Sequence, residues 1–296
     1  MTDVAPNPQA LRPLILTNER GQDVVNPARD GEASIWLTTA NAFPMVVAAG
    51  QLLTDFWVAP RGKKSGDVEV NALAAYSNVP FVCRLKEPTE KGGWYYSNAP
   101  VHHNLMFGRG GKPFKLLRPI YVDAGSFLEV EVTSRAVALS GNIRPVAQAR
   151  WLMPQLPAGS REAIEQAADN RRSRPFWLTD DATVTTLTAG QTDKDIFMTM
   201  PAGMRLINAY LLVESNGPVS LDIYAYEQGF RFTQGGRIDS RIIGGNAAYP
   251  GELGGPIITE PSQRINVKAT DLSGLANTVF CTFHGIAVAD GGSIDA

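Results

Sequence analysis

The residues best suited to acid–base or metal chemistry near neutral pH are three histidines, His102, His103 and His284. His102 and His103 are adjacent, in a stretch beside Pro100 and Asn104 that predicts a loop. Neighbouring residues on a strand point to opposite faces, so a metal shared by this pair would need an irregular backbone and further ligands from elsewhere. His284 lies within an apolar, strand-like run, which favours a histidine in a core or in a subunit contact. We therefore expect no metal site.

Other catalytic signatures are missing from the sequence. The nucleophile elbow Gly-x-Ser-x-Gly does not occur, and no grouping of Ser, His and Asp stands out. Residues 108–112 (Gly-Arg-Gly-Gly-Lys) resemble a phosphate cradle, but Pro113 follows the lysine and no helix comes next, so they predict a hairpin tip. We expect a protein without catalytic residues or a cofactor. A hydrolase that uses His102 or His103 is the alternative from another class.

Four aspartates offer oxygen ligands for a cation. Asp180 and Asp181 are adjacent, and Asp193 and Asp195 follow a short distance along the chain. Calcium binds carboxylate and carbonyl oxygens, but the spacing of these residues matches no known cation loop. We expect solvated turn acids here.

The aromatic run Trp94-Tyr95-Tyr96 follows Lys91-Gly92-Gly93 and looks exposed. Tyr and Trp combine a large apolar ring with a polar group, which suits them to protein interfaces and to stacking on sugars. Three interpretations remain open for this run: contact with another subunit, a strand at the edge of a core, or glycan binding. We take Trp94, Tyr95 and Tyr96 as candidate interface residues.

The chain carries an internal repeat. Ala189–Phe197 (AGQTDKDIF) matches Ala49–Trp57 (AGQLLTDFW) 140 residues upstream. Trp36-Leu37-Thr38 matches Trp177-Leu178-Thr179 at an offset of 141, and further matches keep their order as the offset drifts to 133. Self-similarity at a nearly fixed offset marks repeated structural units, so the sequence predicts one domain repeated in tandem.

Each copy has the pattern of β-strands. Phe127–Val132 alternates apolar and polar residues, as a half-buried strand does, and similar short runs are bounded by Gly, Pro, Asn and Ser. No alternation of strands with helices occurs. We predict an all-β fold of two tandem antiparallel β-sandwich domains, jelly-roll-like, at residues 35–152 and 176–296 with a short C-terminal tail.

Two segments lie outside the predicted sandwiches. Residues 1–34 are polar and contain four prolines, which predicts an arm with one short strand that adds to a sheet edge in its own molecule or in a neighbour, or else a frayed terminus. Residues 153–175 predict a linker in which a short helix joins the domains, or else a plain linker without contacts. The candidate interface residues in these segments are Leu14, Ile15, Leu16, Ile164, Arg171 and Arg172.

Composition narrows the class of partner. The formal charge is −2 with no long block of one sign, so the chain lacks the charge pattern of a nucleic-acid binder. Charged residues make up 19%, below the usual level of about 25%, which favours a surface covered by partners. No apolar run is long enough to span a membrane and no signal peptide is evident. Cys83 and Cys281 read as buried thiols of a protein made in a reducing cytoplasm.

Short segments of the second copy are similar to bacteriophage capsid and accessory proteins: Thr188–Gln191, Pro256–Ile258, Asp271–Asn277 and Gly285 in the last strand. With the tandem sandwiches and the arm, the chain resembles a virion structural protein of a bacteriophage, as a capsid, decoration, or neck or tail component. The resemblance implies a virion location, synthesis in the host cytoplasm, self-assembly as a homotrimer through large interfaces, and contacts with other virion proteins. The alternatives are a carbohydrate-binding module and a receptor-binding tail component.

Overall fold

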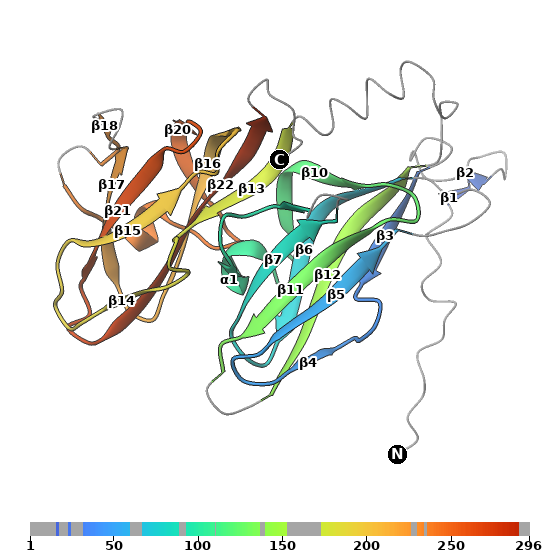
Figure 1. Ribbon diagram of the computed structural model, residues 1–296, viewed down its shortest axis with the longest axis horizontal. Helices are drawn as coiled ribbons and strands as arrows, with labels where there is room; N and C mark the ends of the chain where they lie inside the picture. Colours follow the sequence, from blue (N-terminus) through green and yellow to red (C-terminus); the bar gives the residue numbers. More distant parts are fainter. Residues whose placement is uncertain are drawn as a thin grey trace.

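The computed structural model describes residues 16–17, 23–24, 32–59, 67–88, 93–109, 111–136, 140–152, 173–225, 230–233 and 236–289. Within these ranges the chain folds into two β-sandwiches that lie side by side (Figure 1). The N-terminal sandwich contains β3 (Glu32–Thr38), β4 (Met45–Val47), β5 (Leu52–Val58), β6 (Val68–Ser77), β7 (Phe81–Glu87), β8 (Trp94–Tyr95), β9 (Val101–His102), α1 (His103–Met106), β10 (Phe114–Val122), β11 (Phe127–Ser134) and β12 (Gly141–Leu152).

The C-terminal sandwich repeats this succession of elements one for one. It contains β13 (Ser173–Thr179), β14 (Thr185–Leu187), β15 (Lys194–Thr199), β16 (Met204–Ser215), β17 (Val219–Ala225), β18 (Phe230–Arg231), β19 (Ile238–Asp239), α3 (Ser240–Ile243), β20 (Gly251–Thr259), β21 (Arg264–Asp271) and β22 (Asn277–Ala289).

The strand order is the same in both sandwiches. The N-terminal sandwich has one sheet in the order β10-β6-β12-β3 and another in the order β5-β11-β7-β8. The C-terminal sandwich has the corresponding orders β20-β16-β22-β13 and β15-β21-β17-β18. Strands β5 to β7 and β10 to β12 alternate between the two antiparallel sheets, as do β15 to β17 and β20 to β22, which is the jelly-roll arrangement. The all-β sandwich fold predicted from the sequence is confirmed. The identical strand order of the two sandwiches agrees with the predicted repeat.

Local features repeat as well. Gly50 and Gly190 have φ angles of 69° and 68° at the turns before β5 and β15, a backbone conformation that glycine adopts without strain. The motif that revealed the repeat is therefore a turn followed by a strand. Along β11 the side chains from Phe127 to Ser134 alternate strictly between partly exposed and buried, as the pattern predicted. Both cysteines are buried and unpaired, and burial raises the pKa of Cys281.

The core of the N-terminal sandwich continues into the C-terminal one. Trp177, Leu212 and Ala247 belong to the C-terminal sandwich, yet they pack in one cluster with buried residues of the other, among them Leu105 and Phe114. At this junction β10 lies beside β13 (Figure 1). Buried apolar surface shared in this way makes the two sandwiches one packed block.

Several predictions fall at or beyond the limits of what the structure describes. The short strand predicted in the arm is β1 (Leu16–Thr17), but it pairs with β2 (Asp23–Val24) and not with a sandwich edge. Pairing with a near neighbour closes a smaller loop and costs less chain entropy. The linker helix and the interface candidates Leu14, Ile15, Ile164, Arg171 and Arg172 lie outside the described residues. Among the described residues, no helix has the length and apolar character to cross a membrane.

Candidate functional site

The predicted aromatic run lies at the junction of the two sandwiches. The prediction that it is exposed is wrong for Tyr96, which is only 1% exposed because the C-terminal sandwich covers it. The Tyr96 carbonyl accepts a hydrogen bond from Trp177 N at 2.9 Å, and its hydroxyl donates to Glu87 at 3.2 Å. Glu87 also forms an ion pair with Arg174, whose guanidinium lies 5.0 Å from the Trp94 ring centroid. Contact with another subunit stays a prediction for these aromatic residues.

Tyr95 points away from this junction contact. The Arg84 guanidinium lies 3.7 Å from its ring centroid, and its hydroxyl donates to Glu131 at 3.3 Å. A cation over an aromatic face is stabilising, and it occupies a face that a sugar ring would need for stacking. A sugar that stacks on this face of Tyr95 would therefore have to displace the Arg84 guanidinium.

Asn98 joins the two sandwiches because its side-chain amide bonds the β13 backbone as a neighbouring strand would. Its side-chain oxygen accepts from Thr179 N at 2.7 Å, and its amide nitrogen donates to the Thr179 carbonyl at 2.8 Å and to Asp181 at 3.0 Å. Together with the Tyr96–Trp177 bond, these contacts extend the sheet of the C-terminal sandwich past its edge strand β13. Nothing in the sequence singles out Asn98, since an asparagine in a loop is an ordinary turn residue.

Aromatic rings fill the centre of the junction. Phe114 reaches from the N-terminal sandwich to Trp177, Tyr210 and His284, with ring centroids 6.1, 6.5 and 4.9 Å away. His284 also packs on Trp177 at 4.5 Å. Neither ring nitrogen of His284 meets hydrogen-bonding geometry with a described residue. Desolvation lowers the pKa of His284 to about 3, against a smaller opposing effect of the Phe176 backbone. The expectation of a core histidine is confirmed.

His102 and His103 also lie at this junction, and the predicted loop is wrong. His102 ends β9 and His103 begins α1, and both are largely buried. His102 stacks on Phe280 of the other sandwich, with the ring centroids 4.3 Å apart. Desolvation lowers the pKa of His102 to about 3 and that of His103 to about 4. Both are therefore neutral at neutral pH.

A second polar site is a pocket of about 680 Å³ at the C-terminal sandwich. It brings together the four aspartates that the sequence singled out, and Phe197 and Arg264 complete part of its wall. The Arg264 guanidinium lies 4.8 Å from the Phe197 ring centroid. The pocket thus combines carboxylate acceptors, an aromatic ring and a cation.

Each of these carboxylates already has a partner in the protein. Asp180 accepts from Thr185 at 2.7 Å, and Asp181 accepts from the Thr199 hydroxyl at 2.6 Å. Asp195 accepts from Asn266 at 2.8 Å. In the part of the chain that the structure describes, no three His, Cys, Asp or Glu side chains are grouped to hold a metal ion.

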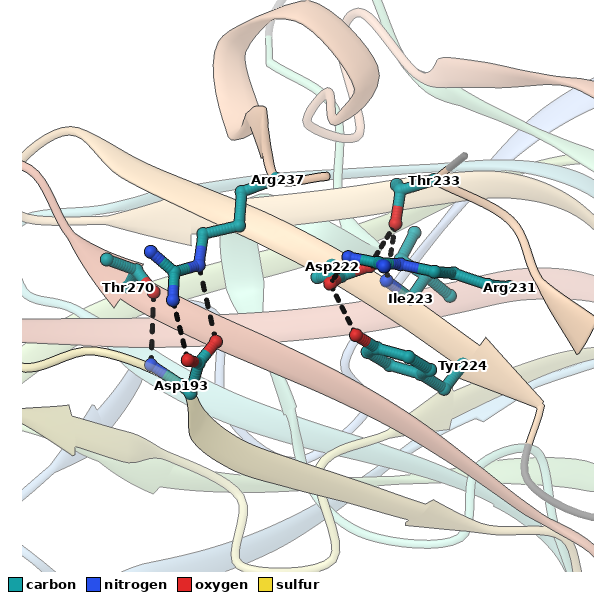
Figure 2. Close-up of polar contacts among 8 residues, drawn as sticks. All are labelled: Asp193, Asp222, Ile223, Tyr224, Arg231, Thr233, Arg237 and Thr270. Atoms are coloured by element: carbon teal, nitrogen blue, oxygen red, sulfur yellow. Dashed lines mark hydrogen bonds and ion pairs between the residues drawn. The ribbon is translucent and has the colours of Figure 1, made fainter. Parts of the chain in front are cut away.

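The fourth aspartate, Asp193, forms a polar cluster with Arg237 and Thr270 beside the β15-β21-β17-β18 sheet (Figure 2). Asp193 forms an ion pair with Arg237 at 2.6 Å, and its backbone N–H donates to the Thr270 hydroxyl at 3.1 Å. These bonds tie the loop before β15 to the segment before β19 and to β21.

Asp222 forms a second, separate network in Figure 2. It accepts hydrogen bonds from Arg231, Thr233 and Tyr224. Desolvation opposes the charge of Asp222, but these three bonds together hold its pKa below the ordinary value. The same residues pin β18 and the residues after it against the sheet, since the Thr233 hydroxyl also accepts from Ile223 N at 3.2 Å.

The fold and these sites define a tandem jelly-roll protein whose halves share a core. No protein-family model matches the chain, and no curated protein matches it. Among solved structures, PNGF-II is similar at a TM-score of 0.34 and 10% identity, over 86% of this chain and 65% of that one. The PBSX exported protein XepA is similar at a TM-score of 0.24 and 12% identity, over 86% of each chain.

A third similar structure has the triple jelly roll fold and belongs to the turret assembly in an archaeal virus. Its TM-score is 0.21 and its identity 9%, over 89% of this chain and 81% of that one. Proteins of viruses therefore occur among the weak structural neighbours, one of them with a jelly-roll fold. At these TM-scores the likenesses carry no argument about function.

Proposed function

We propose that the chain is a structural protein of a virion, which assembles through subunit interfaces into a capsid or a capsid-associated lattice. The observation that carries the proposal is an apolar sheet face left open on a rigid block. The two jelly rolls share one core across their junction, so the chain would enter an assembly as a single preformed unit.

The open face lies on the outer side of the β10-β6-β12-β3 sheet. Trp36, Val46 and Tyr76 are all exposed there. They pair across strands with Gln148, Asn142 and Arg144 of β12, three residues that are separated by even numbers and so share one face. We call Trp36, Val46, Tyr76 and these three partners the open face. Exposed large apolar side chains interleaved with polar ones on one sheet face are typical of a surface that binds another protein.

In this role the protein acts by assembly and not by catalysis. The homotrimer, the contacts with other virion proteins, the virion location and synthesis in the host cytoplasm all belong to the proposal. Its support is the fused tandem sandwich and the open face.

The mass of the protein in solution tests the proposal. Light scattering over a range of concentrations, with negative-stain imaging, should give a stable trimer or a lattice. A chain that stays monomeric at every concentration would overturn the proposal.

The second candidate function is carbohydrate binding, by a module or by a receptor-binding tail component, and one observation favours it. The pocket at the C-terminal sandwich sets carboxylate acceptors beside the Arg264 guanidinium, which Phe197 holds against its ring, and acceptors and donors gathered in one pocket are what sugar hydroxyls bind. A glycan array tests it with Phe197→Ala and Trp94→Ala. Binding that is lost in Phe197→Ala and kept in Trp94→Ala would support this pocket, whereas no binding by the unmodified protein would exclude it.

A further inference from the structure

The tripeptide Trp-Leu-Thr occurs once in each sandwich and has two different environments. In β3 the side chains alternate, so that Trp36 is 54% exposed and Leu37 is buried. In β13 every side chain from Phe176 to Thr179 is buried, and Trp177 is 0% exposed. β3 and β13 hold the same place in their sheets. Equivalent tryptophans therefore differ only in what covers them.

The N-terminal sandwich covers Trp177 with its edge. This contact edge consists of Tyr96–Asn98, α1 and Phe114 at the start of β10. Tyr96–Asn98 bonds the backbone of β13, Phe114 packs on the ring of Trp177, and α1 contacts β16. The contact joins the edge of one jelly roll to the sheet face of the next. It is heterologous, because the two surfaces differ, and such a contact can be repeated by the next unit.

We propose that the open face of the N-terminal sandwich binds the contact edge of the C-terminal sandwich in a second copy of this chain, as the intrachain junction does within one copy. The inference rests on the proposed self-assembly and names the surfaces that would carry it. Each surface has a large apolar side chain exposed in the described residues, Trp36 on the open face and Ile242 on the edge.

The C-terminal sandwich presents the equivalent edge. α3 corresponds to α1, and Ile242 takes the position of Leu105 at an offset of 137. Leu105 is 0% exposed at the intrachain junction, whereas Ile242 is 78% exposed. An isoleucine on a short helical turn, with its side chain in water, gains most from a partner that removes it from water.

The strand-like part of this edge is held ready. Phe232 and Thr233 correspond to Tyr96 and Ser97, because Phe232 N donates to the Ile223 carbonyl as Tyr96 N does to the Leu85 carbonyl. Asp222 fixes Thr233 in the network of Figure 2. Its counterpart, Arg84, fixes Ser97 by donating to the Ser97 carbonyl at 3.1 Å. Thr233 and Ser97 are thus held by different side chains. Because these segments are ordered before binding, less conformational entropy is lost when they bind.

Strand β3, which would receive this edge, also has a free side within the described residues. In the described part of the chain, β3 is an edge strand that pairs with β12 alone. Its outer edge offers backbone groups at Trp36 and Thr38, the equivalents of Trp177 and Thr179, which Tyr96 and Asn98 bind in the other sandwich. An unpaired strand edge readily accepts another strand-like segment.

The aromatic centre of the intrachain junction is not duplicated. Gly251 stands where the register places Phe114, and Gln148 stands where it places His284. The contact between chains therefore has less aromatic surface to bury than the junction within the chain. It should be the weaker of the two, so that the chain folds first and associates afterwards.

Arginine substitutions on the two surfaces test the proposal. Trp36→Arg disrupts the open face and Ile242→Arg disrupts the edge of the C-terminal sandwich. Each should weaken self-association by about 30-fold or more, the effect of losing a central interface residue. Leu52→Arg is the matched control, because Leu52 is an exposed leucine on the other sheet of the N-terminal sandwich. Circular dichroism and thermal unfolding confirm that each variant folds.

Mixing the two variants separates this contact from other kinds of interface. Each variant keeps one intact surface, so Trp36→Arg and Ile242→Arg should be monomeric alone and form a one-to-one dimer when mixed. Assembly that persists in both variants would overturn the inference and leave the proposed structural role standing. A mixture that remains monomeric would also overturn it. An unmodified protein that is monomeric at every concentration would overturn the proposed function itself.

Discussion

The equivalent tryptophans provide a matched pair for measuring what the junction contributes to stability. Trp177→Ala and Trp36→Ala remove the same side chain from the same position of two jelly rolls with the same strand order. Only Trp177 is covered by the other sandwich. We expect Trp177→Ala to destabilise the protein much more than Trp36→Ala.

The magnitude follows from the buried surface. A fully buried tryptophan removes about 200 Å² from water, which corresponds to about 5 kcal/mol at 25 cal/mol/Å². Residual burial in the unfolded chain lowers this figure, and the cavity left at Trp177 raises it, so about 4 kcal/mol is expected. Trp36 buries about half as much surface and leaves no enclosed cavity, so its loss should cost about 1.5 kcal/mol.

Urea unfolding followed by far-UV circular dichroism measures both values. The measurement requires a concentration at which the chain is monomeric, because association would add a concentration-dependent contribution. A single cooperative transition is expected, since the core runs through the junction. Equal effects of the two substitutions, or a loss below about 2 kcal/mol for Trp177→Ala, would refute this account of the junction.

Three further measurements probe the same structure. The folded-state pKa of His284, about 3, lies below its ordinary value of 6.5, so the unfolded chain binds the proton first and stability falls as the pH drops from 6.5 towards 3. In acid urea titrations, His284→Phe should lower the slope of stability against pH by about 1.4 kcal/mol per pH unit, and an unchanged slope would contradict this prediction. Asn98→Ala should cost about 1–3 kcal/mol in urea unfolding, because it leaves the buried Thr179 amide unpaired, and a neutral effect would show that the bond contributes nothing. Gly190→Ala should raise the energy of a positive-φ turn by about 1 kcal/mol, whereas Gly111→Ala, with open space and no positive φ, should be neutral; equal melting temperatures would refute the strain argument.

The sequence predicted those parts of the fold that depend on short-range pattern. The alternation along Phe127–Val132 predicted a strand buried on one face, and the offset between Trp36 and Trp177 predicted two copies of one unit. Glycine before a strand, as at Gly190, predicted a turn. These features follow from the local geometry of the chain, which neighbouring residues determine.

The junction could not be predicted in the same way. Trp36 and Trp177 have the same neighbours in sequence, so no local pattern distinguishes the exposed residue from the buried one. Asn98 and Phe114 act on partners far along the chain, and their roles depend on how one sandwich sits on the other. The aspartates were identified as a group, but only the fold shows that a partner within the protein already binds each carboxylate.

The covalent link between the sandwiches changes how the junction responds to dilution. Two units in one chain meet at an effective concentration that the linker sets, of the order of millimolar for short flexible connections. The contact around Asn98 and Trp177 therefore forms at any protein concentration. An equivalent contact between chains has no such link and depends on how much protein has accumulated. Duplication in one chain would thus keep Trp177 and its surroundings permanently covered by the other sandwich. How often the open face is covered would instead depend on the local concentration of the protein.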